Sequence, residues 1–223
     1  MKINRIIGLA VAGLICFAGF VAKAETSDGG RMTASEAFSS LPVSVLDLLD
    51  NSRRLDMLDY YAVDSIVKVP NTMEGVSYLE KVTPDYLKVC LTPVSTMTIK
   101  ILPAKKGEIV MVAYTVGDKD QAYDTDLRFY DTSFNELKRD KFLQQAPLDA
   151  FFSCPDKAAR KEVAALVPFP TVRYLPDEQG TDMTAEMTAG QFLSQDDKKI
   201  IGKYLKPSGV RYRWTGSKFN LEK

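Results

Sequence analysis

The chain has 223 residues, of which 45% are hydrophobic and 26% are charged, and its 29 basic residues equal its 29 acidic residues in number. This composition predicts a globular protein, and the absence of a basic excess argues against binding to nucleic acid or to an anionic membrane surface. The sequence contains no histidine, which excludes Ser-His-Asp and Cys-His hydrolases and zinc sites that depend on histidine ligands. A chain without histidine can still use a pair of carboxylates, a lysine-activated serine or an oxygen-ligated metal for catalysis.

Residues 1–24 have the pattern of a secretory signal peptide. Two basic residues precede the apolar run of residues 6–20, and residues 22–24 (Ala-Lys-Ala) place small side chains around a cleavage site. The run is short for a membrane span and ends in a processing site. We therefore expect an exported protein, periplasmic or associated with the cell envelope, with no transmembrane span after cleavage. The leader holds three basic residues and no acid, so the mature chain from Glu25 keeps 26 basic and 29 acidic residues.

Residues 25–32 form a short polar lead, and the folded domain is expected to start at Thr33. Thr33 and Glu36 have the spacing of a capping box, which predicts a helix that ends before Pro42. From residue 43 to about residue 62, apolar residues recur at helical spacing, so we expect a longer amphipathic helix there.

Beyond residue 64 the hydrophobic residues alternate with polar ones, which is typical of strands. Short turns rich in Pro, Gly and Asp separate the segments, as in an antiparallel meander. We expect strands at residues 64–69, 76–82, 86–91, 94–102, 108–116 and 123–130. The segment 109–116 is apolar at successive positions and is expected in the centre of the sheet.

The rest of the chain alternates short helices with short strands. Helical patterns are expected at residues 147–152, 155–166 and 194–205, strands at 171–175 and 182–188, and a closing hairpin at 210–221. The predicted fold class is α+β: a mostly antiparallel β-sheet in meander order with flanking helices and an N-terminal helical pair. Residues 33–223 are expected to form a single domain, with a potential subdomain break near 140–155.

Two cysteines remain after removal of the leader, Cys90 and Cys154. An exported compartment favours a disulfide between them, but the sequence does not show whether their Cα atoms lie within bonding range. The alternative is a reactive thiol at Cys154, which precedes a predicted helix whose N-terminus would favour the thiolate. No histidine is available to serve as its base, and no cofactor is predicted.

The densest acidic cluster comprises Asp118, Asp120, Asp124 and Asp126. Carboxylates at this spacing would bind calcium if a hairpin folded them together. The alternative is a charged, solvated turn between two strands, since turns select Asp for local hydrogen bonds. The cluster lacks the closing glutamate of an EF-hand, so the turn is the simpler interpretation.

Near the C-terminus, large apolar residues alternate with Arg211 and Arg213. An exported protein could stack a sugar on Trp214 and hold its hydroxyls with Arg213. The alternative is a half-buried strand in which Val210, Tyr212 and Trp214 face the core and the arginines face water.

Four runs in the sequence together resemble one protein family. They are AFSSLP at residues 37–42, NSRRLDMLDYY at 51–61, LRFYD at 127–131 and YRW at 212–214. With these runs the chain resembles a family of small exported proteins of unknown function from Bacteroides-like bacteria, over most of its mature length. The resemblance implies no catalytic residue, and it directs attention to the second run, with Arg54, Asp56 and Asp59 as candidate ligand-binding groups. The alternative for these three is an ordinary charged helix face.

These features favour an exported, non-enzymatic binding or interaction module of the envelope or periplasm, whose partner is an unknown envelope protein or glycan. The alternative is a histidine-free hydrolase that uses a pair of carboxylates on glycan or cell-wall material. Acidic residues are abundant, but the sequence singles out no pair among them. A third hypothesis is a structural subunit of a surface assembly.

Overall fold

The structure, a computed structural model, describes residues 30–118 and 122–222. The chain divides into Met1–Arg31 and a compact unit, Met32–Lys223, which holds every helix and strand described. The predicted signal peptide lies outside the described residues. The compact unit is α+β, with four α-helices and eleven strands in two antiparallel sheets among its described residues, as expected. None of the described helices is long and apolar enough to cross a lipid bilayer.

Helix α1 (Ala34–Ser40) forms where the sequence predicts it, because its first turn is capped locally. The Thr33 hydroxyl accepts a hydrogen bond from the backbone N–H of Glu36 at 3.1 Å. The Glu36 carboxylate in turn accepts one from the backbone N–H of Thr33 at 2.7 Å. This reciprocal pair is the expected capping box.

Helix α2 (Asn51–Ala62) is shorter than the helix expected over residues 43–62, because its N-cap lies inside that range. The Asp50 carboxylate accepts a hydrogen bond from the backbone N–H of Arg53 at 2.9 Å, and this cap marks the start of the helix. The preceding residues run as turns and bends, from which several leucines enter the core. The expected start at residue 43 is therefore wrong.

Seven strands form a large sheet in which each strand pairs antiparallel with the next along the chain, which confirms the meander. They are β1 (Val69–Pro70), β2 (Val76–Val82), β3 (Tyr86–Thr92), β4 (Ser95–Pro103), β5 (Glu108–Val116), β6 (Asp124–Tyr130) and β7 (Glu136–Leu137). Strand β5 pairs along its length with β4 and β6, so its central place is confirmed. The strand expected at 64–69 is wrong except for Val69, because Asp64 adopts a left-handed conformation (φ 55°) and residues 65–68 are irregular.

The remaining strands form a small sheet in the order β11-β10-β9-β8. Its strands are β8 (Val172–Pro176), β9 (Met183–Met187), β10 (Val210–Trp214) and β11 (Phe219–Leu221). The accompanying helices are α3 (Lys157–Leu166), α4 (Gln195–Gly202) and the 3-10 turns η1 (Arg139–Lys141), η2 (Leu148–Phe151) and η3 (Ala189–Phe192). Except for η1 and η3, these elements lie close to the ranges that the sequence predicts.

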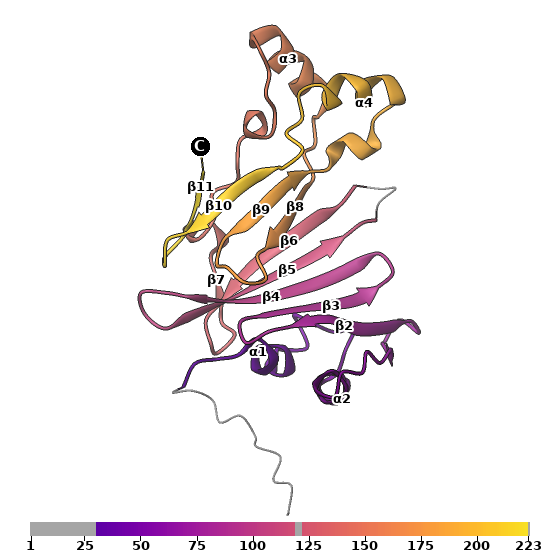
Figure 1. Ribbon diagram of the computed structural model, residues 1–223, viewed down its shortest axis with the longest axis vertical. Coiled ribbons are helices and arrows are strands. Elements are labelled where there is room, and N and C mark those ends of the chain that lie inside the picture. The colour runs from indigo at the N-terminus through magenta and orange to yellow at the C-terminus, as the bar shows by residue number, and fades with distance from the viewer. Residues whose placement is uncertain (1–29, 119–121, 223) are drawn as a thin grey trace, which may run out of the picture. The chain divides into compact units, whose positions relative to one another are not determined.

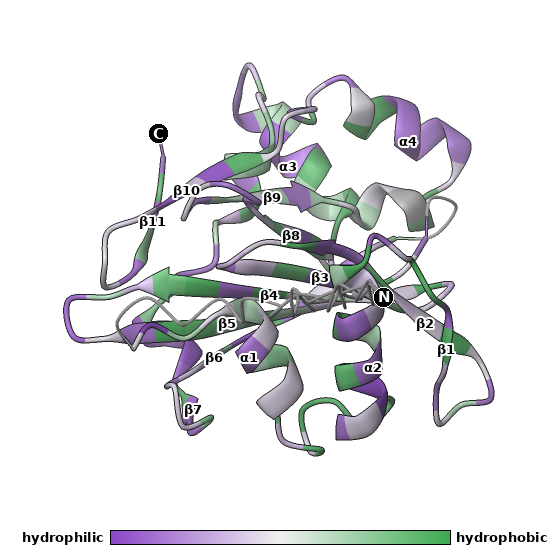
Figure 2. Ribbon diagram, turned by 60° about the horizontal axis from the view of Figure 1, so that its bottom comes forward, coloured by the Kyte–Doolittle hydropathy of each residue, from purple (hydrophilic) through white to green (hydrophobic). Residues whose placement is uncertain are grey.

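Alternate residues of the large sheet face two separate cores. Residues such as Ile99 and Val112 pack against α1, α2 and the segment between them. Met111, Ala113 and Phe129 point the other way and pack against the small sheet. Figure 1 shows α1 and α2 on one side of the large sheet and the small sheet, with α3 and α4, on the other. Hydrophobic and hydrophilic residues follow one another along several strands in Figure 2.

Strand β8, at one edge of the small sheet, is bonded to the large sheet. The backbone N–H of Tyr174 donates to Thr125 Oγ1 at 3.1 Å, and that of Val172 donates to the Asp124 carboxylate at 3.2 Å. Side chains of β6 thus satisfy backbone groups that a free sheet edge would leave open.

Candidate functional site

Arg54, one of the candidate ligand-binding groups on α2, makes structural contacts. Only 2% of its surface is exposed, and its Nη1 atom donates to the carbonyl oxygens of Phe38 at 2.9 Å and Leu41 at 2.7 Å. These carbonyls lie at the C-terminal end of α1, where helix carbonyls lack partners within the helix. Asp56 and Asp59 are exposed to solvent, so the structure does not gather the three candidates into one site.

The acidic cluster is distributed over a turn and the start of β6. Asp124 accepts the β8 hydrogen bond, and Asp126 forms an ion pair with Arg128 at 2.7 Å. Asp118 also makes interactions, and Asp120 lies outside the described residues. Within the described ranges, no three Cys, Asp or Glu side chains converge in a way that could hold a metal ion. The calcium alternative therefore gains no support from Asp118, Asp124 and Asp126.

The two cysteines are free thiols, so the expected bridge between Cys90 and Cys154 is not formed. Cys90 is buried on β3 of the large sheet, where its Sγ lies 3.3 Å from the carbonyl oxygen of Thr92. Cys154 is half-buried between η2 and α3, beside the small sheet. The two residues belong to different parts of the fold, which the sequence could not show.

Trp214 lies in the core between the two sheets. It is 8% exposed, and its Nε1 donates to the carbonyl oxygen of Pro103 at 2.7 Å. Its ring lies 4.9 Å from that of Phe219 and 6.4 Å from that of Phe142, measured between centroids. The side chain of Arg213 is 68% exposed and lies on the opposite face of β10. The structure therefore separates the two residues considered for sugar binding.

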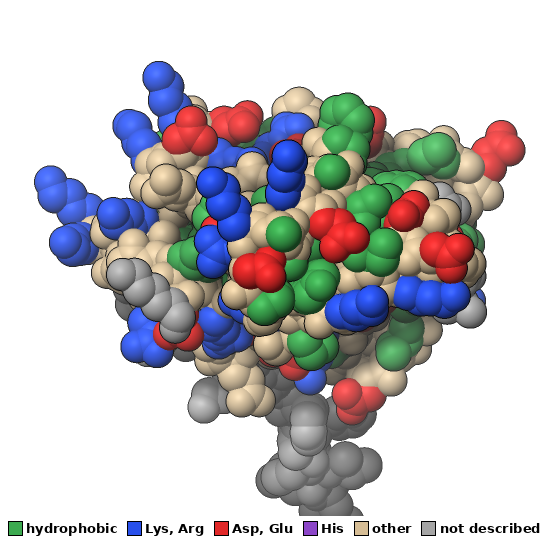
Figure 3. Space-filling view, turned by 90° about the horizontal axis from the view of Figure 1, so that it is seen from above, with side chains coloured by type: hydrophobic (Ala, Val, Ile, Leu, Met, Phe, Trp, Pro, Cys, Tyr) green, Lys and Arg blue, Asp and Glu red, His purple; other side chains and the backbone are tan. Residues whose placement is uncertain are grey.

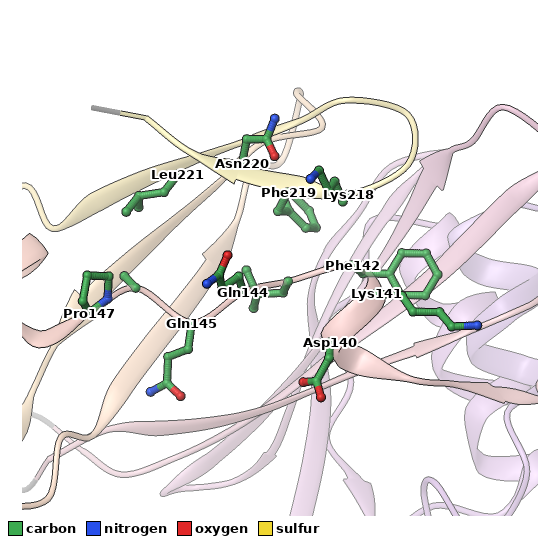
Figure 4. A pocket seen from close by; sticks show the side chains of 12 residues that line it. Asp140, Lys141, Phe142, Gln144, Gln145, Pro147, Lys218, Phe219, Asn220 and Leu221 are labelled. Carbon is green, nitrogen blue, oxygen red and sulfur yellow. The ribbon is translucent and has the colours of Figure 1, made fainter.

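A slot of about 290 Å³ opens between the edge strand β11 and the segment that follows β7 (Figure 4). This hollow, the β11 slot, is lined by residues Asp140–Pro147 and Lys218–Leu221. Figure 4 shows Leu221 and Pro147 toward one end of the slot and Phe142 toward the other. Its two walls come from distant parts of the sequence.

Three contacts hold the walls of the β11 slot in place. The backbone N–H of Phe219 donates to the carbonyl oxygen of Phe142 at 2.7 Å, and Leu143 forms a parallel β-bridge with Phe219. Next along the chain, the Tyr212 hydroxyl donates to the carbonyl oxygen of Gln144 at 3.1 Å. Residues 142–144 are thus bonded to both strands of the closing hairpin, β10 and β11.

Three of the six polar residues that line the β11 slot are neutral amides: Gln144, Gln145 and Asn220. All three are exposed, and their side chains make no hydrogen bond to any residue in the described part of the chain. One carboxylate and two lysines also line the slot, toward its Phe142 end in Figure 4. No pattern in the sequence indicates this site, because only the pairing of Phe142 with Phe219 brings its two walls together.

Tyr212 should make the protein sensitive to alkaline pH. Burial raises the pKa of Tyr212 to about 12; the neighbouring Tyr174 adds to the shift and Arg139 opposes it. The unfolded chain ionises this tyrosine near pH 10, so above that pH it binds fewer protons than the folded chain and stability falls. We expect a loss of about 2–3 kcal/mol from Tyr212 between pH 10 and about pH 12, measured by urea unfolding.

The variant Tyr212→Phe should reduce this alkaline loss. A matched control is Tyr60→Phe, which removes the same hydroxyl group from a tyrosine that is 45% exposed on α2. Identical pH profiles for Tyr212→Phe and the unmodified protein would show that Tyr212 does not cause the loss.

A second hollow, of about 300 Å³, lies between η2 and α3 and has a mostly apolar lining. Leu148, Phe152 and Val163 contribute apolar surface, and Asp149 and Arg160 are its charged residues. Figure 3 shows the face that carries α3 and α4, where hydrophobic side chains gather among acidic and basic ones. An apolar pocket of this size with few polar groups is typical of small-ligand sites.

Comparison with known proteins gives a fold and a family. No curated protein matches the chain. A solved domain of an uncharacterized protein from Porphyromonas gingivalis W83 is similar, with a TM-score of 0.72 and 20% identity over 84% of this chain and 96% of that chain. At this identity the likeness shows the fold alone. Residues 30–219 match the family described as "Protein of unknown function (DUF3256)", in agreement with the resemblance seen in the sequence. The chain therefore belongs to the DUF3256 family of proteins of unknown function.

Proposed function

We propose that this protein is an exported, non-catalytic binding module of the periplasm or cell envelope and that the β11 slot is its ligand site. The leader-like residues 1–24 support export. The observation that carries the proposal is that Gln144, Gln145 and Asn220, whose amides have no partner among the described residues, all line one hollow. Arg54 and Trp214, by contrast, are engaged by backbone carbonyls.

Away from the charged residues at its Phe142 end, the lining of the β11 slot favours an uncharged polar ligand. Each amide side chain offers both hydrogen-bond donors and an acceptor without a net charge. Leu221 and Pro147 add apolar surface beside them. Groups that alternate donors and acceptors, such as peptide bonds or sugar hydroxyls, complement this lining.

A second candidate function is the binding of a small apolar molecule between η2 and α3. The apolar lining of that hollow favours it, and Arg160 could pair with an acidic group on such a ligand. This ligand would bind independently of the β11 slot.

A thermal-shift screen of the mature protein, residues 25–223, tests the proposal with muropeptides, oligosaccharides, short peptides, bile salts and fatty acids. A ligand at a hundred times its dissociation constant adds about 2.7 kcal/mol, which raises Tm by about 2–4 °C per kcal/mol at this size. The shift should disappear when Gln144→Ala is combined with Asn220→Ala. It should persist in Gln179→Ala, a matched control in the exposed β8–β9 loop.

Two results would contradict the proposal. One is the absence of any shift across the screen. The other is a ligand whose shift survives in the Gln144→Ala/Asn220→Ala variant and is lost in Arg160→Ala, which would assign the function to the hollow beside α3.

A further inference from the structure

The four sheet edges differ in what they leave open. The edge of β11, three residues long, is bonded to Phe142 through Phe219 and leaves Leu221 facing the β11 slot. At the ends of the large sheet, β1 and β7 are two residues long, and Pro70 in β1 has no N–H to donate. At one end of the small sheet, β8 is bonded to side chains of β6. Strand β11, at the other end, lines a hollow instead.

The backbone of Leu221 is directed toward the β11 slot. The N–H of Glu222 donates to the carbonyl oxygen of Arg211 at 2.9 Å, so Glu222 bonds to β10. In an antiparallel pair, successive residues alternate between bonding to the neighbour and pointing away from it. The backbone N–H and C=O groups of Phe219 and Leu221 therefore point away from β10. The hydrogen bond from the Phe219 N–H to the Phe142 carbonyl oxygen confirms this direction.

The facing wall of the slot already approaches β11 as a strand. Leu143 and Phe219 form a parallel bridge, and the slot continues from this bridge along Gln144 and Gln145. A strand edge and free amide side chains both complement peptide groups, because each peptide unit carries one donor and one acceptor. Addition of an extended peptide to a sheet edge is an established recognition mode that obtains its affinity from such backbone bonds.

We infer that the β11 slot binds an extended, uncharged peptide segment, which adds to the edge of β11 as a further strand. The inference rests on the proposed function and names the ligand class of the same site. The peptide backbone bonds to Leu221, and the amides of Gln144 and Gln145 bond to its other peptide groups. Every second side chain of the peptide lies on the apolar surface of Leu221 and Pro147, so small apolar residues are expected at alternate positions.

A phage-displayed heptapeptide library selected on the mature protein, residues 25–223, tests the inference. Selected peptides should bind Leu221→Ala a few-fold more weakly than the unmodified protein, because part of the apolar surface is lost. They should bind Leu221→Pro about tenfold more weakly than Leu221→Ala, because only proline also removes the N–H directed into the slot. N-methylation at alternate peptide positions should weaken binding about tenfold and at the intervening positions should change it little, since a strand presents every second N–H to a given neighbour.

Hydrogen exchange of the Leu221 amide gives a second measurement that does not depend on how Leu221→Pro folds. In the unmodified protein this amide should exchange more slowly when a selected peptide is bound. Peptides that bind without the alternating N-methyl effect, or without protecting Leu221, would overturn strand addition.

The two proposals fail in different ways. If no peptide is selected but an oligosaccharide shifts Tm in a manner that requires Gln144 and Asn220, the peptide inference is overturned and the β11 slot remains the site. If no compound of any class depends on those two residues, both proposals are overturned.

Discussion

Replacement of Arg54 with alanine should lower the free energy of unfolding by about 3–5 kcal/mol, because it strips two buried carbonyl oxygens of their donor. The Arg54 guanidinium bonds to Phe38 and Leu41 at the end of α1, with 2% of the residue exposed. Each carbonyl left unsatisfied costs about 1–3 kcal/mol, and the lost side chain leaves a cavity besides. Urea unfolding of the mature protein, followed by far-UV circular dichroism, measures the loss.

The charge of Arg54 has two opposing effects on the free energy of unfolding. Burial lowers the pKa of Arg54, and the nearby Asp50 carboxylate opposes this shift, so the folded protein bears a cost for keeping the charge. Helix α1 has no basic residue in its last turn, and Arg54 supplies the positive charge that favours a helix C-terminus. We expect the two hydrogen bonds and this favourable field to outweigh the cost of burial.

Two further variants separate the contributions of Arg54. Arg54→Met keeps most of the apolar stem and removes the hydrogen bonds, so it should recover only the packing part of the loss. Arg53→Ala is the matched control, because Arg53 is its neighbour on α2 and forms an exposed ion pair with Asp50 at 2.5 Å. Such pairs contribute about 0–1 kcal/mol. Similar stabilities for Arg54→Ala and Arg53→Ala would show that Arg54 does not anchor α1.

Local signals in the sequence predicted most of the fold. The ranges expected for β2 and β5 agree with the structure. Alternating residues indicated the half-buried strand β2, and a continuous apolar run indicated β5, which is buried on both faces. The start of α1 at Thr33 and that of α4 at Ser194 follow from side chains that cap helices within three residues. Such contacts lie within the window that a sequence pattern covers.

The predicted helix and strand ranges are wrong where the local backbone conformation departs from the hydrophobic pattern. Apolar residues between 43 and 50 continue the helical spacing of α2, but the Asp50 cap begins the helix later and leaves those residues as a buried, irregular segment. Residues 64–69 alternate as a strand would, yet the left-handed conformation of Asp64 directs the chain through a turn. Hydrophobicity predicted burial in the first case but not the conformation of the backbone.

The candidate site could not be predicted from the sequence for a different reason. Gln144 and Asn220 share a hollow only because Phe142, just after η1, pairs with Phe219 in β11, a contact that no spacing in the sequence indicates. The charged run around Arg54 attracted attention by its composition. Composition does not distinguish an arginine that binds a ligand from one that bonds to helix carbonyls.

Trp214→Ala should also destabilise the protein by about 3–5 kcal/mol and lower Tm by about 10 °C, as expected for truncation of a large buried aromatic residue. The indole packs on Phe142 and Phe219 and bonds to the carbonyl oxygen of Pro103 at 2.7 Å. Its loss removes packing between the two sheets and leaves that carbonyl without its donor. Thermal melts followed by circular dichroism are the appropriate measurement, because Trp214 is the only tryptophan and the variant would lose the fluorescence signal.

Arg213→Ala is the matched control for Trp214, since it alters the neighbouring residue on the exposed face of β10. The Arg213 side chain is 68% exposed and pairs with Glu222 at 2.5 Å, so its removal should change stability by about 1 kcal/mol or less. The sugar-binding interpretation makes the opposite prediction: both variants would keep their stability and lose affinity for an oligosaccharide. A Trp214→Ala protein of unchanged stability would therefore contradict a core role for Trp214. It would instead favour a ligand site on this strand.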